Sequence, residues 1–157
     1  MKKIFFSIAL FATAFVQQSY AQDSATTQPW PLLNSYYNLK DALVASNANA
    51  AAVSAADFAK ILDGMAKETV QPATRKVLVS DASIISQSRD LKVQREKFAT
   101  LSANMVELAK TVKLSADPVY QQYCPMKKAS WLSSAPTIKN PYFGNAMLTC
   151  GSVKTKL

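Results

Sequence analysis

The sequence contains no histidine and only three glycines in 157 residues. Without histidine the chain can form neither a Ser-His-Asp nor a Cys-His catalytic arrangement, nor a histidine-based zinc site. Three glycines are too few for the glycine-rich loop that cradles phosphate groups in nucleotide-binding proteins. The carboxylates are scattered over predicted helices, which gives no support to a carboxylate pair for glycoside hydrolysis. We therefore expect a protein that is not an enzyme.

An apolar run near the N-terminus is too short to cross a membrane. Two lysines precede residues 4–16, a mostly apolar run of 13 residues, and small side chains follow at Ser19 and Ala21. A membrane-spanning helix needs about 20 apolar residues, whereas this pattern is typical of a secretory signal peptide, here residues 1–21. No cysteine follows the expected cleavage site, so a lipoprotein is not expected. These features predict a periplasmic protein with no membrane span after signal cleavage.

Acidic side chains are missing from the last part of the chain. Residues 22–117 hold 11 basic and 10 acidic residues, whereas residues 118–157 hold no Asp or Glu. The basic residues of this second part are Lys127, Lys128, Lys139, Lys154 and Lys156. Such a basic tail indicates either an acidic partner or a scatter of lysines that keeps the protein soluble. A nucleic-acid partner is not expected for an exported protein.

Residues 32–117 carry four segments in which apolar side chains recur every three or four residues, the spacing of amphipathic helices. A flexible leader, residues 22–31, precedes them. Gln71-Pro72 breaks the pattern, and Asp90 can cap the fourth helix, although continuity of the third and fourth helices stays open. The predicted inward side chains are Leu32, Tyr36, Leu39 and Leu43; Phe58, Ile61, Leu62 and Met65; Val77, Leu78, Ala82, Ile84 and Ile85; and Phe98, Leu101, Met105, Leu108 and Val112.

Four such helices joined by short connections can bury their apolar stripes only against one another. We therefore expect an all-α, up-and-down bundle of about four helices in a single domain. Residues 118–157 are rich in aromatic side chains and proline, a composition that is not helical. This segment is expected to belong to the same domain and to pack short extended pieces on one end of the bundle.

The distinctive chemistry lies in two sulfur-containing strings, Cys124-Pro125-Met126 and Met147 to Cys150. In an extended segment, Cys124 and Met126 point to the same side, and a helical turn aligns Met147 with Cys150. Thiolate and thioether sulfur favour Cu(I) over harder ions. Zinc finds only two good ligands here, too few for a closed tetrahedral site.

A structural disulfide is the alternative interpretation of the two cysteines. Exported proteins commonly pair their cysteines, and closing the Cys124–Cys150 loop would stabilise the fold by roughly 3 to 4 kcal/mol. Met126 and Met147 would then fill the hydrophobic core. The residues alone leave both interpretations open.

Several strings along the chain resemble a known family. They are residues 36–44, 94–98, 119–126, 131–133, 138–144 and 147–151. The chain resembles a domain of unknown function from Bacteroidetes, which occurs as a stand-alone periplasmic protein or appended to CusB-like adaptor (membrane fusion) proteins of heavy-metal efflux pumps. The resemblance implies a helical bundle with a metal-associated C-terminal motif, carried here by Cys124, Met126, Met147 and Cys150. Tyr123 stands where some relatives have histidine.

These observations lead to two functional hypotheses. The first is a periplasmic protein that binds or delivers a soft metal ion, Cu(I), through Cys124, Met126, Met147 and Cys150, and passes it to a periplasmic efflux adaptor. The second is a non-catalytic helical interaction module of the cell envelope. In that protein Cys124 and Cys150 form a structural disulfide, and the basic, aromatic tail docks on an envelope protein.

Overall fold

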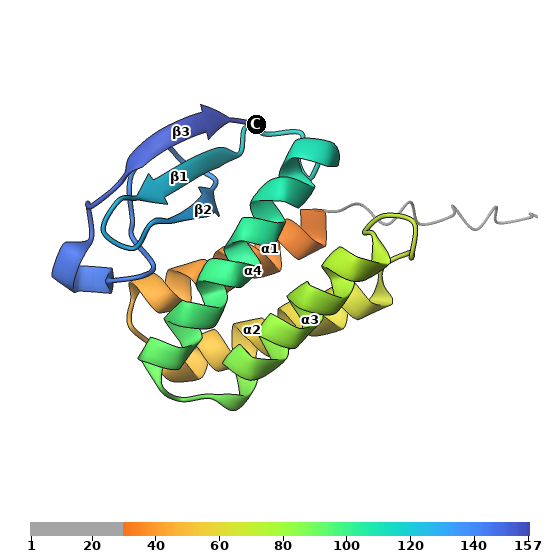
Figure 1. The fold of residues 1–157 in the computed structure, drawn as a ribbon, viewed down its shortest axis with the longest axis horizontal. Helices are drawn as coiled ribbons and strands as arrows, with labels where there is room; N and C mark the ends of the chain where they lie inside the picture. Colours follow the sequence, from red (N-terminus) through yellow and green to blue (C-terminus); the bar gives the residue numbers. More distant parts are fainter. Residues whose placement is uncertain (1–29) are drawn as a thin grey trace, which may run out of the picture.

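The computed structural model describes residues 30–157 (Figure 1). The expected signal peptide and residues 22–29 of the expected leader lie outside this range. The described chain forms four helices, a short 3-10 helix and a three-stranded sheet. The elements are α1 (Trp30–Val44), α2 (Ala48–Gly64), α3 (Pro72–Gln87), α4 (Leu91–Thr111), β1 (Tyr120–Cys124), β2 (Ala129–Ser133), η1 (Gly144–Met147) and β3 (Ser152–Lys156). The four helices were predicted correctly, but the all-α class was wrong because the C-terminal segment forms a true sheet.

Local capping signals set the helix boundaries. The Asn47 side chain accepts a hydrogen bond from the Ala50 amide, so α2 begins at Ala48 and includes the alanine run. Proline occupies the first position of α3, where its missing N–H costs nothing. Asp90 accepts a hydrogen bond from the Lys92 amide at 2.8 Å, so α3 and α4 are separate helices.

The predicted apolar stripes form most of the core, with an exception on α3. Leu78, Ala82 and Ile85 are fully buried, whereas Val77 and Ile84 are 39% and 37% exposed. The buried three are spaced four and three residues apart and share one helix face. Val77 and Ile84 lie seven apart on a different face, so their predicted inward orientation was wrong.

Successive helices pack side by side, and the sheet lies along the other side of the first and last helices. α1 packs on α2, α2 on α3 and α3 on α4, while β2 packs against α4. Figure 1 shows the sheet beside α1 and α4, on the side away from α2 and α3. The C-terminal segment therefore packs along the side of α4 and not on one end of the bundle.

The sheet has the order β2-β1-β3 and is antiparallel throughout. A four-residue turn, residues 125–128, joins β1 to β2 and includes Lys128 at a positive φ of 55°. β3 returns from the end of the chain and pairs with the other edge of β1. The central strand β1 is therefore held on both sides, and its last residue is Cys124.

Tyr36 of α1 connects the bundle to the sheet. Its hydroxyl lies 2.6 Å from Ser102 Oγ of α4 and accepts a hydrogen bond from the Leu132 amide of β2 at 3.0 Å. The Tyr36 ring stacks on Phe98, with 5.4 Å between ring centroids. Tyr142 packs against Phe98 and also against Trp131 of β2, so a continuous row of rings runs from α1 to the sheet.

The substitution Tyr36→Phe tests this connection. It leaves the ring in place but deprives the Ser102 hydroxyl and the buried Leu132 amide of a partner, so we expect the free energy of unfolding to fall by about 1 to 3 kcal/mol. The matched control is Tyr37→Phe, because Tyr37 makes no hydrogen bond through its hydroxyl to any residue from Trp30 onward. Urea denaturation followed by circular dichroism measures both. Equal effects in the two variants would contradict the proposed importance of the Tyr36 hydroxyl.

Candidate functional site

Cys124 and Cys150 lie next to each other although 26 residues separate them in sequence. Their Sγ atoms are 3.8 Å apart, and both cysteines are free thiols. Cys124 ends β1 and is fully buried, while Cys150 precedes β3 and is half-buried. The pairing of Tyr123 with Ser152 across β1 and β3 brings the two cysteines together. The structure thus places two of the four predicted sulfur residues in direct contact.

Asn140 positions the Cys150 side of this pair. Its side-chain Nδ2 donates a 2.7 Å hydrogen bond to the Cys150 carbonyl, and its Oδ1 accepts one from the Tyr142 amide. The Asn140 amide donates to the Leu148 carbonyl at 2.8 Å. This fully buried side chain therefore holds residues 140–150 in a fixed loop next to the thiol pair. Sequence analysis did not single out Asn140, although a polar residue before Pro141 indicates a turn.

Gly151 allows the backbone that follows Cys150 to lie close to the sheet. Its φ of 153° is rarely adopted by other residues. A Cβ atom at this position would lie 2.9 Å from Trp131 Cη2 and 3.0 Å from the Tyr123 carbonyl oxygen. Glycine is therefore required for the close contact between Cys150-Gly151 and the buried ring of Trp131.

Met126 lies in the turn that follows β1 and is 66% exposed. The expectation that it shares one side of an extended segment with Cys124 was wrong, because the strand ends at Cys124 and Pro125 begins the turn. The turn has another effect on the site. The Lys127 amide donates a hydrogen bond to Cys124 Sγ at 3.4 Å, so a backbone group of the turn contacts this sulfur directly.

Met147 ends η1 and is half-buried. The Cys150 amide donates a 3.0 Å hydrogen bond to the Met147 carbonyl, so the two residues span one tight turn, as the spacing predicted. The prediction that both methionines fill the core under the disulfide interpretation was wrong for Met126, which faces solvent. Met126 therefore lies in an exposed turn, and Met147 is only partly buried.

Sulfur dominates the ligands available at this site. Among residues 30–157, no group of three or more His, Cys, Asp or Glu side chains comes together for a metal ion. The Cys150 thiol has a raised pKa, caused first by desolvation and then by the hydrogen bond and charge of Cys124. Met126 and Met147 are the methionines nearest in sequence to these two thiols.

Comparison with known families gave a match to the helical part of the chain. The family model described as "Protein of unknown function (DUF3347)" matches residues 32–117, more than half of the chain. Neither the curated proteins nor the solved structures gave a match. No helix in residues 30–157 has the length and apolar character needed to cross a membrane. The matched residues contain the four helices, and the thiol pair lies beyond them.

Replacing Gly151 with alanine should disturb the thiol pair through Trp131. The added Cβ meets the Trp131 ring and the Tyr123 backbone at an unfavourable φ, so we expect about 1 to 3 kcal/mol of lost stability. Gly64→Ala is the control, because a Cβ there has no atom within 4 Å. Urea denaturation monitored by tryptophan fluorescence compares them. The assignment fails if Gly151→Ala is as well tolerated as Gly64→Ala.

The raised pKa of Cys150 predicts the pH dependence of its alkylation. Only the thiolate reacts, so half-maximal alkylation of Cys150 in the folded protein should require a higher pH than in the urea-unfolded protein. In Cys124→Ser the midpoint should fall, yet stay above the unfolded value, because desolvation of Cys150 remains. Peptide mass spectrometry after brief iodoacetamide treatment measures each midpoint. A midpoint that is identical in folded and unfolded protein would refute this description of the site.

Proposed function

This chain belongs to the DUF3347 family, and we propose that it binds a soft metal ion, Cu(I), at the Cys124–Cys150 thiol pair and delivers it within the cell envelope. Met126 and Met147 supplement the two thiolates in this proposal. The observation that carries it is the 3.8 Å contact between the sulfur atoms of two free thiols, one fully buried and the other half-buried.

The spacing of the sulfur atoms suits a bent metal site. From a metal ion at the usual thiolate distance of about 2.3 Å, two sulfurs 3.8 Å apart subtend an angle of about 110°. A linear two-coordinate ion would hold them about 4.6 Å apart. The observed distance therefore leaves room for a third ligand, and Met147, one turn from Cys150, is a candidate for it.

The ligand chemistry favours Cu(I) among the common biological metals. The chain has no imidazole, and no Asp or Glu follows Asp117. Zinc sites are completed by imidazole, carboxylate or further thiolates, which this segment does not offer. Thiolate and thioether sulfur together are the ligands that Cu(I) prefers.

The exposure of the sulfur residues supports delivery as well as binding. Cys124 is fully buried, Cys150 is half-buried and Met126 is 66% exposed, so sulfur ligands extend from the interior to solvent. A metal ion can exchange between such donors without ever losing all of its ligands. The signal-peptide pattern supports a periplasmic location, and the resemblance to domains carried by CusB-like adaptors of Bacteroidetes supports an efflux adaptor as the recipient.

A structural disulfide remains the second candidate, because thiols 3.8 Å apart can reach the S–S bond length of about 2.05 Å after modest side-chain movement. The protein would then be a helical interaction module of the envelope without metal chemistry. Titration of free thiols in protein isolated from the periplasm separates the two candidates. With the protein unfolded in urea so that buried Cys124 can react, we expect two reactive thiols per chain, whereas none would favour the disulfide.

Native mass spectrometry under reducing conditions tests metal binding directly. The wild-type protein should take up a single Cu(I) ion. Cys124→Ser and Cys150→Ser should each weaken binding by about a hundredfold or more, because each removes a thiolate ligand, and Met147→Leu by about tenfold. Competition with a Cu(I) chelator of known affinity gives these ratios.

Thr149→Ser provides the matched control, because Thr149 is exposed and lies directly beside Cys150 but contributes no sulfur. It should bind Cu(I) as the wild type does. Circular dichroism confirms that each cysteine variant is folded. Unchanged copper uptake in folded Cys124→Ser and Cys150→Ser would overturn the metal-binding proposal.

A further inference from the structure

β3 forms an open edge of the sheet. Its only strand neighbour within residues 30–157 is β1, and all five of its residues are exposed. Figure 1 shows β3 on the outer side of the sheet, away from the helices. The opposite edge differs, because the Leu132 amide of β2 is bonded to the Tyr36 hydroxyl. Of the two edges of this sheet, the β3 edge is therefore the one whose backbone N–H and C=O groups are open to another chain.

The alternation of backbone hydrogen bonds shows which groups are available. Val119 and Leu157 exchange both of their backbone hydrogen bonds, at 3.2 and 2.8 Å. In an antiparallel pair the next position is non-hydrogen-bonded, so the N–H and C=O of Lys156 point away from β1. An added strand could use both groups without any rearrangement of the sheet.

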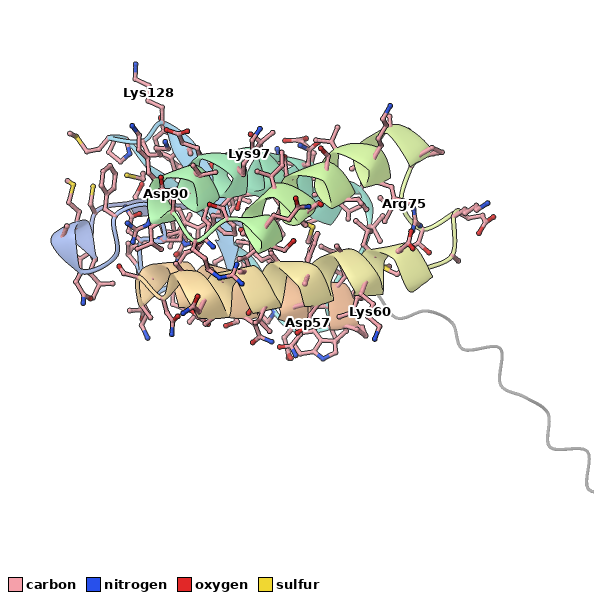
Figure 2. All side chains as sticks on the ribbon, turned by 90° about the horizontal axis from the view of Figure 1, so that it is seen from below. Asp57, Lys60, Arg75, Asp90, Lys97 and Lys128 are labelled. Carbon is pink, nitrogen blue, oxygen red and sulfur yellow. The ribbon has the colours of Figure 1, made fainter. Side chains whose placement is uncertain are left out.

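The charge of this edge selects its partner. Lys154 and Lys156 lie on β3, which contains no Asp or Glu, and Lys127 and Lys128 lie in the turn at the other end of β1 from Lys156. Asp117 lines a surface groove together with Lys156. Figure 2 shows Lys128 projecting away from the fold. Lysines on an edge strand oppose pairing with neutral or basic strands, including β3 of a second copy. An acidic strand gains from the same charges.

We propose that the free edge of β3 binds an extended acidic segment of a partner protein by strand addition. The backbone of Lys156 supplies the pairing groups, and Lys154 and Lys156 supply the charge preference. This docking does not depend on metal binding.

An acidic peptide of about six residues with alternating Glu and Thr, matching the usual strand length, is the probe. NMR titration of the metal-free protein should show the largest shifts on β3 and slower hydrogen exchange at the Lys156 amide. Binding should weaken at high salt, because the contacts are between exposed charges. The double variant Lys154→Glu and Lys156→Glu should weaken it by at least about tenfold.

Three controls make the result decisive. The double variant Lys60→Glu and Lys76→Glu makes the same charge change on exposed lysines of α2 and α3, and it should bind the peptide as the wild type does. A peptide with Lys in place of Glu should not bind. An acidic peptide with a central proline keeps its charge but loses a backbone donor, so it should bind at least about tenfold more weakly.

The proposal is overturned if the proline peptide binds equally well, since attraction would then be electrostatic without strand pairing. It is equally overturned if the Lys156 amide keeps its exchange rate at saturating peptide. Analytical ultracentrifugation without peptide tests whether a second copy of the chain binds this edge instead. A dimer that Lys156→Pro abolishes would mean that a second copy uses the edge and would overturn the proposal. Failure of copper binding would leave this result unaffected.

Discussion

The contact between Tyr36 and the edge of β2 determines where the sheet sits on the bundle. One hydroxyl bonds the Leu132 amide of β2 and lies against Ser102 of α4, so a single buried oxygen joins two helices to a strand. β2 then fixes β1 by pairing, and β1 fixes β3. The two cysteines meet because this sequence of pairings is complete, since Cys124 ends β1 and Cys150 lies two residues before β3. The helical bundle thus supports chemistry that lies outside it.

Helices could be predicted from the sequence because their signals are local. Apolar spacing identified most of the inward side chains, apart from Val77 and Ile84, and Pro72 and Asp90 mark helix boundaries through local signals. The sheet could not be predicted in the same way. β3 is exposed along its whole length and shows no alternation of apolar and polar residues, and it pairs with a strand about 30 residues earlier. Its formation depends on non-local pairing that no short window of sequence contains.

In the candidate site, too, local features could be predicted from the sequence and non-local ones could not. The spacing of Met147 and Cys150 correctly predicted a turn, because three residues suffice to define it. The orientation of Met126 was predicted wrongly, because the end of β1 at Cys124 depends on the pairing with Ala129 and on the following proline. The role of Asn140 was not predicted from the sequence for a related reason. Its role comes from a hydrogen bond to the Cys150 carbonyl ten residues away, which only the folded loop reveals.

The separation between the family match and the thiol pair has a consequence for function. The match covers residues 32–117, the part that supplies a scaffold, while the cysteines and the open strand both lie in residues 118–157. Gly151 connects these two features, because it joins Cys150 to β3 and packs against the buried Trp131 ring. A strand added to β3 would stiffen the backbone on one side of Gly151, and Asn140 already holds the other side. The thiol pair and the open strand edge therefore depend on one short stretch of backbone, Cys150-Gly151, that lies outside the part matched by the family model.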